Sequence, residues 1–148
     1  MPEDLQVTVD KFTFRVPTDR FYTAEGIWAK AEENGIRLGL SDFLQQRSGD
    51  VAFAEVKAVG TSVQAGEEIA VIETIKVNIS LGSPVHGTVV EVNPEMETAP
   101  EAINQDPYGV GWLAVLTAEN WEADQANLLD PSAYFAKMKR EAEDEVKK

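Results

Sequence analysis

Lys76 is the most informative side chain in this sequence that could do chemistry. It is the only lysine or arginine between residues 58 and 136, and it shares that segment with twelve acidic residues. A soluble surface ordinarily intersperses both signs of charge. The ordinary interpretation of such a residue is a solvated lysine on a strand, with its ammonium group in water. Its isolation marks it as a candidate functional residue.

The other reactive side chains do not form a catalytic or metal site in the sequence pattern. His86 is the only histidine. A hydrolytic triad also needs an activated nucleophile and an orienting acid, and nothing marks Ser80 or Ser83 as activated. One histidine cannot build a typical zinc site, and the carboxylates lack the alternating ligands of a calcium loop. We therefore expect no catalytic residue and no metal site, with His86 in a turn.

Net charge and composition indicate which partners the chain can bind and where it is located. The 148 residues carry a net charge of -13, which disfavours nucleic acid and anionic membranes and favours docking onto basic protein surfaces. No cysteine is present, so disulfides and thiol nucleophiles are excluded. No apolar run reaches the length of a membrane helix, and Met1–Asp4 lacks the features of a signal peptide. These patterns predict a cytoplasmic protein that binds neither nucleic acid nor membrane, and we expect a monomer.

The elements around Lys76 predict where its side chain points. Residues 71–80 alternate in hydrophobicity, with Ile75, Val77 and Ile79 on one parity and Lys76 on the other. Side chains alternate across a strand, so Lys76 should point away from the core. A tight turn at Lys76 would place its amine at an exposed tip.

The rest of the chain consists mostly of short strand-like runs separated by turn signals. Asn34-Gly35 predicts a two-residue hairpin turn, since both residues tolerate positive φ. Ser41 predicts a helix cap before a short helix that ends near Gly49, and Asp130-Pro131 predicts the start of a C-terminal helix. Residues 49–72 are echoed by residues 87–116, which indicates two quasi-repeated halves. We expect a mainly β fold, a β-sandwich or flattened barrel with short flanking helices. The predicted organisation is an N-terminal extension over residues 1–20, a β-sandwich over residues 21–118 and a helical segment over residues 119–148.

Several motifs in register resemble the glycine cleavage system H protein and its lipoyl-carrier relatives. The resemblance runs from about residue 21 to about residue 135. The matching segments, in chain order, are Tyr22-Thr23, Trp28, Gly39-Leu40-Ser41-Asp42-Phe43, Gly49-Asp50-Val51, Ala65-Gly66-Glu67, Val71-Ile72-Glu73-Thr74-Ile75-Lys76, Ser83-Pro84-Val85-His86-Gly87 with the strand after it, and Asn104 to Trp112. The resemblance implies a lipoyl-type β-sandwich that carries a cofactor and is not itself an enzyme. It implies that Lys76 holds lipoate in amide linkage and that Glu73, three positions earlier, is recognised at the attachment site.

The sequence also departs from the family pattern. A histidine that the family usually has before Trp28 is absent, the residues after the lysine are larger than usual, and about twenty residues precede the family core. These departures favour the lipoate-binding proteins of heterodisulfide-reductase-like sulfur oxidation. The alternative is a true H protein that shuttles an aminomethyl group in glycine cleavage.

The predicted partners follow from the same resemblance. They are lipoate-attaching enzymes together with either a heterodisulfide-reductase-like complex or the glycine cleavage enzymes. A biotin carrier typically has methionines beside its lysine, and here Ile75 and Val77 flank it. A lipoyl domain of a 2-oxoacid dehydrogenase usually has Asp-Lys-Ala at its tip, which is also absent. An interaction module that is never modified is the alternative from a different class.

Overall fold

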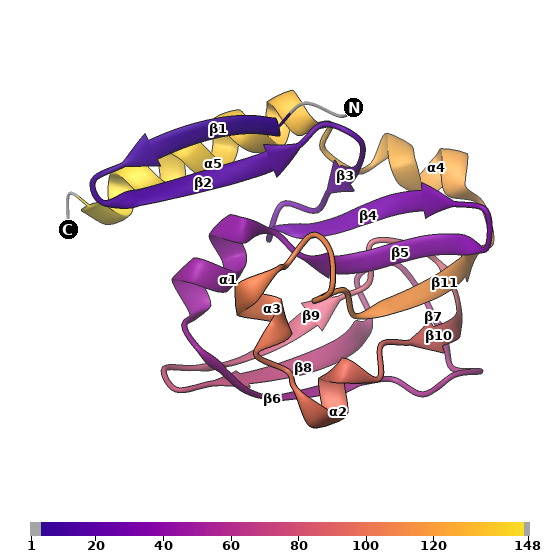
Figure 1. Cartoon of the computed structure of the whole chain (residues 1–148). Coiled ribbons are helices and arrows are strands. Elements are labelled where there is room, and N and C mark those ends of the chain that lie inside the picture. Colours follow the sequence, from indigo (N-terminus) through magenta and orange to yellow (C-terminus); the bar gives the residue numbers. More distant parts are fainter. Residues whose placement is uncertain (1–3, 147–148) are drawn as a thin grey trace.

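The computed structural model describes residues 4–146 (Figure 1). The strands are β1 (Asp4–Val9), β2 (Phe12–Pro17), β3 (Phe21–Tyr22), β4 (Ile27–Glu32), β5 (Gly35–Leu40), β6 (Val51–Val56), β7 (Ser62–Val63), β8 (Glu68–Thr74), β9 (Asn78–Gly82), β10 (Gly87–Val92) and β11 (Ala114–Ala118). The helices are α1 (Asp42–Ser48), α2 (Glu95–Thr98), α3 (Ala102–Gln105), α4 (Trp121–Ala126) and α5 (Pro131–Val146).

Two antiparallel sheets face each other and form the expected flattened sandwich (Figure 1). The larger sheet has the strand order β3-β4-β5-β11-β10-β7, and the smaller has the order β6-β8-β9. Apolar side chains from both sheets meet in one cluster, for example Leu38 and Leu116 from the larger sheet and Ile72 from the smaller. All three are fully buried, which is where the alternating pattern of a two-layer β fold places its apolar residues.

The internal repeat predicted from the sequence is present in the strand pairing. β6 pairs with β8, and β10 pairs with β11, both antiparallel. The first pair has a β-bulge between Val51 and Phe53, and the second has one between Val89 and Glu91. These positions are equivalent when Gly49 is aligned with Gly87. The two halves therefore share both their pairing and the place where it is interrupted.

A second apolar cluster joins the two ends of the chain to the sandwich. The hairpin β1-β2 and helix α5 lie side by side along one side of the molecule (Figure 1). Their side chains, such as Phe14 and Met138, pack with Trp28 of the larger sheet and Phe43 of α1. Each of the three ranges expected from the sequence, 1–20, 21–118 and 119–148, contributes side chains to this cluster.

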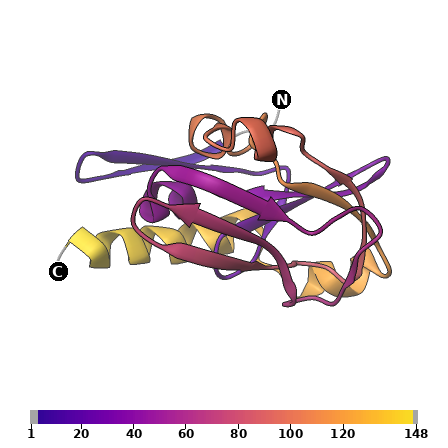
Figure 2. The same cartoon turned by 90° about the horizontal axis from the view of Figure 1, so that it is seen from below.

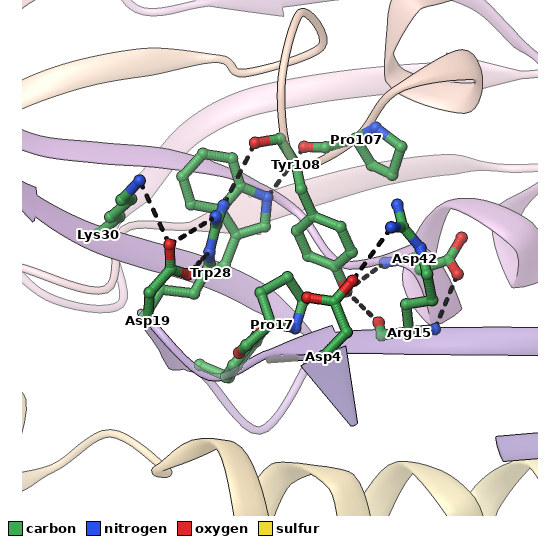
Figure 3. A network of polar contacts seen from close by, with 11 residues as sticks. Asp4, Arg15, Pro17, Asp19, Trp28, Lys30, Asp42, Pro107 and Tyr108 are labelled. Carbon is green, nitrogen blue, oxygen red and sulfur yellow. Dashed lines mark hydrogen bonds and ion pairs between the residues drawn. The ribbon is translucent and has the colours of Figure 1, made fainter. Parts of the chain in front are cut away.

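Tyr108 fastens the N-terminal hairpin to helix α1 (Figure 3). Its hydroxyl donates to the carbonyl oxygen of Arg15 at 2.6 Å and accepts from the backbone N–H of Asp42 at 2.9 Å. The Asp42 carboxylate in turn accepts from the backbone N–H of Arg15 at 3.0 Å. The side chains of Tyr108 and Asp42 thus satisfy the backbone N–H at the start of α1 and both backbone groups of Arg15 at the outer edge of β2.

Arg20 is buried between aromatic rings next to this junction. Its guanidinium carbon lies 4.6 Å from the centre of the Trp28 ring and 5.3 Å from that of Tyr108. Its Nε donates to the Asp19 carboxylate at 2.8 Å, and Lys30 Nζ lies 3.4 Å from the same carboxylate. Burial alone would raise the pKa of Asp19, but the hydrogen bond and charge of Arg20, with those of Lys30, outweigh it and hold that pKa below its ordinary value of 3.8. Figure 3 shows Asp19 and Lys30 meeting at one end of the network.

Two helix caps expected from the sequence are confirmed, and one turn differs. Ser41 caps α1 by accepting from the N–H of Leu44, and the helix ends at Gly49. Asp130 accepts from the N–H of Ala133 at the start of α5. The loop between β4 and β5 consists of residues 33–34, because Glu32 pairs with Gly35. The turn is therefore one residue earlier than the Asn34-Gly35 signal predicts, and Gly35 itself adopts the positive φ of 141°.

No helix within residues 4–146 is long and apolar enough to cross a membrane.

Candidate functional site

Lys76 lies in the turn that connects β8 to β9, so the exposed tip expected from the sequence is present. The turn is organised by the side chain of Thr74. The Thr74 hydroxyl accepts from the N–H of Lys76 at 3.1 Å and from the N–H of Val77 at 3.0 Å, and it donates to the carbonyl oxygen of Val77 at 2.9 Å. The N–H of Thr74 donates to that same carbonyl at 2.8 Å. The threonine hydroxyl thus closes the turn by hydrogen bonds, and no residue of the turn has a positive φ, so the chain reverses here without a glycine.

The tip rests on the segment that follows α1. The N–H of Ile75 donates to the carbonyl oxygen of Asp50 at 3.1 Å, and Lys76 Nζ donates to that of Arg47 at 3.3 Å. A side chain at Gly49 would place its Cβ 2.9 Å from Lys76 Cδ, and Gly49 has a φ of +92°. Glycine is therefore required here for the backbone conformation, and its lack of a side chain lets the flexible lysine stem lie against this segment. None of the ion pairs among residues 4–146 involves the Lys76 ammonium.

Asn104 holds this supporting segment in place from α3. Its Nδ2 donates to Gln45 Oε1 at 3.0 Å and to the carbonyl oxygen of Gly49 at 3.1 Å. Its Oδ1 accepts from the N–H of Val51 at 2.9 Å. One amide side chain thus bridges the end of α1, the connecting segment and the start of β6. The sequence pattern offered no direct signal for this role, because the partners are more than fifty residues away.

Glu73 lies on β8 and is exposed to solvent, three positions before Lys76. It pairs with Asn78 of β9 on one side and with Phe53 of β6 on the other. The structure therefore brings Glu73 to the strand that leads into the lysine turn. Its role in recognition stays a prediction.

Phe53 is exposed at the surface, although strict alternation along β6 would place it in the interior. Val51 faces the core, and strict alternation would turn Phe53 the same way. The bulge between these two residues inserts an extra position, so that Phe53 turns outward and Ala54 packs against the core instead. The ring is 68% exposed, and Ile75 at the lysine tip is 75% exposed. The equivalent strand β10 has a bulge at the matching position, and neither bulge had a signal in the sequence.

Two hollows flank the lysine hairpin. One, of about 690 Å³, lies over the outer face of the three-stranded sheet, where Phe53 and Glu73 meet Met96 and Glu97 of α2. The other, of about 970 Å³, lies between β9, α1 and α5, with Val77 and Arg47 among its lining residues. Lys76 thus stands between two concave surfaces of different charge. The first is lined by four glutamates and no cationic side chain, and the second by two glutamates together with Arg47 and Lys137.

His86 lies away from this region, in the segment between β9 and β10. Its backbone N–H and its Nδ1 contact the two carboxylate oxygens of Asp124 at 2.9 and 2.8 Å. Asp124 is buried in α4, so this pair ties the helix to the sandwich. Within residues 4–146 no group of three or more potential metal ligands occurs.

Comparisons with known proteins give one consistent result. The family model described as "Glycine cleavage H-protein" matches residues 20–141, so β1 and β2 lie outside it. The glycine cleavage system H protein of Rubrobacter xylanophilus is 40% identical over 126 residues, which are 85% of this chain and 97% of the relative. That of Thermus thermophilus is 40% identical over 127 residues, 86% of this chain and 98% of the relative. The crystal structure of a glycine cleavage system H protein from Mycobacterium marinum superposes with a TM-score of 0.74 and 31% identity, and covers 82% of this chain and 97% of that one.

Proposed function

Since the chain belongs to the glycine cleavage H-protein family, we propose that it is a lipoyl carrier of glycine cleavage with lipoate amide-linked to Lys76. Members of this family carry lipoate covalently on a lysine and act as carriers, not as catalysts. The observation that carries the assignment to Lys76 is its position at the exposed tip of the β8–β9 turn. Membership of this family also supports the β-sandwich fold and the lipoate cofactor that were expected from the sequence.

The residues around Lys76 fit a covalently attached group. The side chain is exposed, so its end is accessible to an enzyme. Gly49 leaves room for the aliphatic stem, and Thr74 fixes the backbone that presents it. Within the described residues Nζ donates to the Arg47 carbonyl, and an amide N–H can still donate to that oxygen after modification.

The chain contributes position and electrostatics to the carrier role. When bound, lipoate supplies a disulfide that can be reduced and thiols that can hold an adduct, chemistry that a chain without cysteine lacks. Acylation converts the Lys76 ammonium into a neutral amide, so the tip enters a partner's cleft without a charge to desolvate. The hydrogen bonds of Thr74 define the backbone position from which the arm extends, and tethering raises the local concentration of the attached group in a docked partner.

The assignment is tested by intact mass of the protein made in a host that attaches lipoate. We expect a mass increase of one lipoyl group on the unaltered chain and on Lys57→Arg, and none on Lys76→Arg. Lys57 is the matched control, because it is the preceding lysine in the chain and is half-exposed beside Glu68. A lipoyl increment that persists in Lys76→Arg would refute the assignment, as would its absence from the unaltered chain.

The comparisons bear on the choice of pathway. The departures from the family pattern favoured sulfur oxidation from the sequence alone. None of the relatives named above supports that interpretation or a heterodisulfide-reductase-like partner, whereas their names favour glycine cleavage. Glycine cleavage is therefore the function we propose, with glycine dehydrogenase and aminomethyltransferase as the partners. The lipoylated chain should support glycine-dependent release of carbon dioxide by its own organism's glycine dehydrogenase, and Lys76→Arg should not.

A further inference from the structure

The apolar side chains around Lys76 are exposed to an unusual degree. Phe53 is 68% exposed, and Ile75 and Val77 at the tip are 75% and 47% exposed. Single exposed apolar residues are ordinary, but a group of them beside a functional residue is typical of an interaction site. The bulge in β6 turns Phe53 outward in place of Ala54, so the backbone conformation of β6 holds this aromatic ring on the surface.

The hollow beside Phe53 is negatively charged. Glu55 and Glu73 reach it from the sheet, and Glu97 and Glu101 reach it from the α2 region. All four carboxylates are exposed, none is in an ion pair among the described residues, and no lysine or arginine lines the hollow. Figure 2 shows the three-stranded sheet from its outer side, with no other element of the described chain in front of it and α2 alongside β6. The surface therefore offers an aromatic anchor inside an acidic rim.

We propose that this surface, defined by Phe53 with Glu55, Glu73, Glu97 and Glu101, is where the enzyme that acylates Lys76 docks. Its complement is a basic rim around an apolar pocket that receives the Phe53 ring. Aromatic anchors within a polar rim carry most of the affinity in protein interfaces, and rim charges set the encounter rate and register. This inference rests on the proposed function, since it presupposes that Lys76 is acylated.

The short reach of the unmodified Lys76 side chain favours the acylating enzyme as the partner that binds the surface around Phe53. An unmodified lysine extends only about 6 Å from its Cα, so an enzyme that acts on Nζ must cover the hairpin itself. Phe53 pairs with Glu73, which is three residues from Lys76, so the two Cα atoms lie within about 16 Å of each other. A standard interface covers about 800 Å² on each partner, a patch of about 16 Å in radius. Later partners are reached by a longer arm and are under no such constraint.

The bond made at this interface is an amide. Nζ forms a bond to the carbonyl carbon of a lipoyl adenylate, and the bond from that carbon to the phosphate oxygen breaks. AMP leaves with the electron pair, and two of the three ammonium protons are released. The docking surface takes no part in this chemistry. It aligns Nζ with the acyl group, so its loss should act on KM more than on kcat.

The test is the initial rate of lipoyl attachment to the full chain by its own organism's lipoate ligase, with lipoate and ATP, followed by intact mass. We expect Phe53→Ala to raise KM by about tenfold or more with kcat retained. Phe12→Ala is the matched control, since Phe12 is a phenylalanine 52% exposed on the distant hairpin. We expect the pair Glu97→Gln and Glu101→Gln to raise KM several-fold at low salt and little at high salt, and Glu119→Gln with Glu122→Gln to have no effect.

Binding separates docking from chemistry. Lys76→Arg cannot be acylated, so its affinity for the ligase can be measured directly by fluorescence anisotropy, with and without Phe53→Ala. Weaker binding on loss of Phe53 supports the proposal, provided that the thermal midpoint of the variant is unchanged. Unaltered KM and affinity in Phe53→Ala, with Lys76 still acylated, would overturn the docking surface and leave the proposed function standing. An unaltered chain that the ligase never modifies would overturn the proposed function and this inference with it.

Discussion

Asn104→Asp probes the side chain that holds the support of the lysine turn. The substitution keeps size and shape, and the remaining oxygen can still accept from the N–H of Val51. The donations to Gln45 Oε1 and to the Gly49 carbonyl are both lost, at about 0.5–1.5 kcal/mol each. A carboxylate oxygen then faces those two acceptors at about 3 Å with no donor between them. The sum is a loss of about 2–4 kcal/mol at neutral pH.

The two acceptors cannot easily adapt to the change. Gln45 is buried, and its Nε2 already donates to the Asp42 carboxylate at 3.0 Å, so rotating its amide would break that bond. The pKa of the introduced carboxyl should rise above its ordinary value, because the protonated acid can donate one of the lost bonds. A raised pKa in the folded state contributes stability that is present below about pH 4 and lost as pH rises through the folded value. The cost of Asn104→Asp should therefore shrink on acidification.

The assay is urea unfolding of the variant and the unaltered chain at neutral pH and near pH 4. We expect a lower midpoint with an unchanged slope, which indicates lost stability and not a changed denatured state. Asn127→Asp is the control, because Asn127 is exposed and its amide makes one bond of 3.4 Å. It should cost at most about 1 kcal/mol. A cost for Asn104→Asp equal to that of Asn127→Asp, or one independent of pH, would refute the role assigned to the Asn104 amide.

The other predictions concern the turn and the buried tyrosines. Thr74→Val should lower the free energy of unfolding by about 1 kcal/mol and speed amide exchange at Lys76 and Val77, because three hydrogen bonds at the exposed tip are lost. Thr88→Val is the control, because it removes one exposed hydroxyl bond. Unchanged amide exchange in Thr74→Val would count against the role of this hydroxyl in the turn. Burial raises the pKa of Tyr22, Tyr108 and Tyr134 above the ordinary 10.0. The stability that this represents is present below about pH 10 and lost as pH rises further, so tyrosinate absorbance should appear together with unfolding. Ionisation of these tyrosines in a protein that keeps its folded circular dichroism would contradict it.

The lysine tip could be predicted from sequence because its signals are local. Its isolation among acidic residues marked Lys76 as a candidate functional residue. The strand parity predicted for residues 75–77 was wrong, because these residues form the turn, and Ile75 and Val77 are exposed together with Lys76. The turn itself was harder to predict, since it lacks glycine and depends on the Thr74 hydroxyl, which bonds to groups two and three residues away. A β-branched residue in an alternating run is ordinarily a strand signal, so its role in the turn was hidden.

The features that the sequence did not reveal depend on contacts between distant residues. The outward turn of Phe53 follows from a one-residue irregularity in pairing with β8, which alternation within β6 cannot report. Asn104 bridges segments more than fifty residues away. The hairpin between β4 and β5 was correctly expected, but its loop lies one residue earlier than predicted, because Gly35 pairs with Glu32 and leaves residues 33–34 in the loop. Periodicity identified the elements, and packing between them determined these details.

Because Lys76 is isolated from other lysines and arginines in the sequence, digestion with trypsin can show whether it is modified. Trypsin cuts after lysine and arginine, and in the denatured chain the single site between Lys57 and Lys137 is the bond after Lys76. An unmodified chain therefore yields two fragments, residues 58–76 and 77–137, whereas an acylated chain yields one uncut fragment, residues 58–137. The ratio of these peptides measures the occupancy of Lys76 without any enzyme of the pathway, because Lys76 is the only lysine between the flanking sites Lys57 and Lys137.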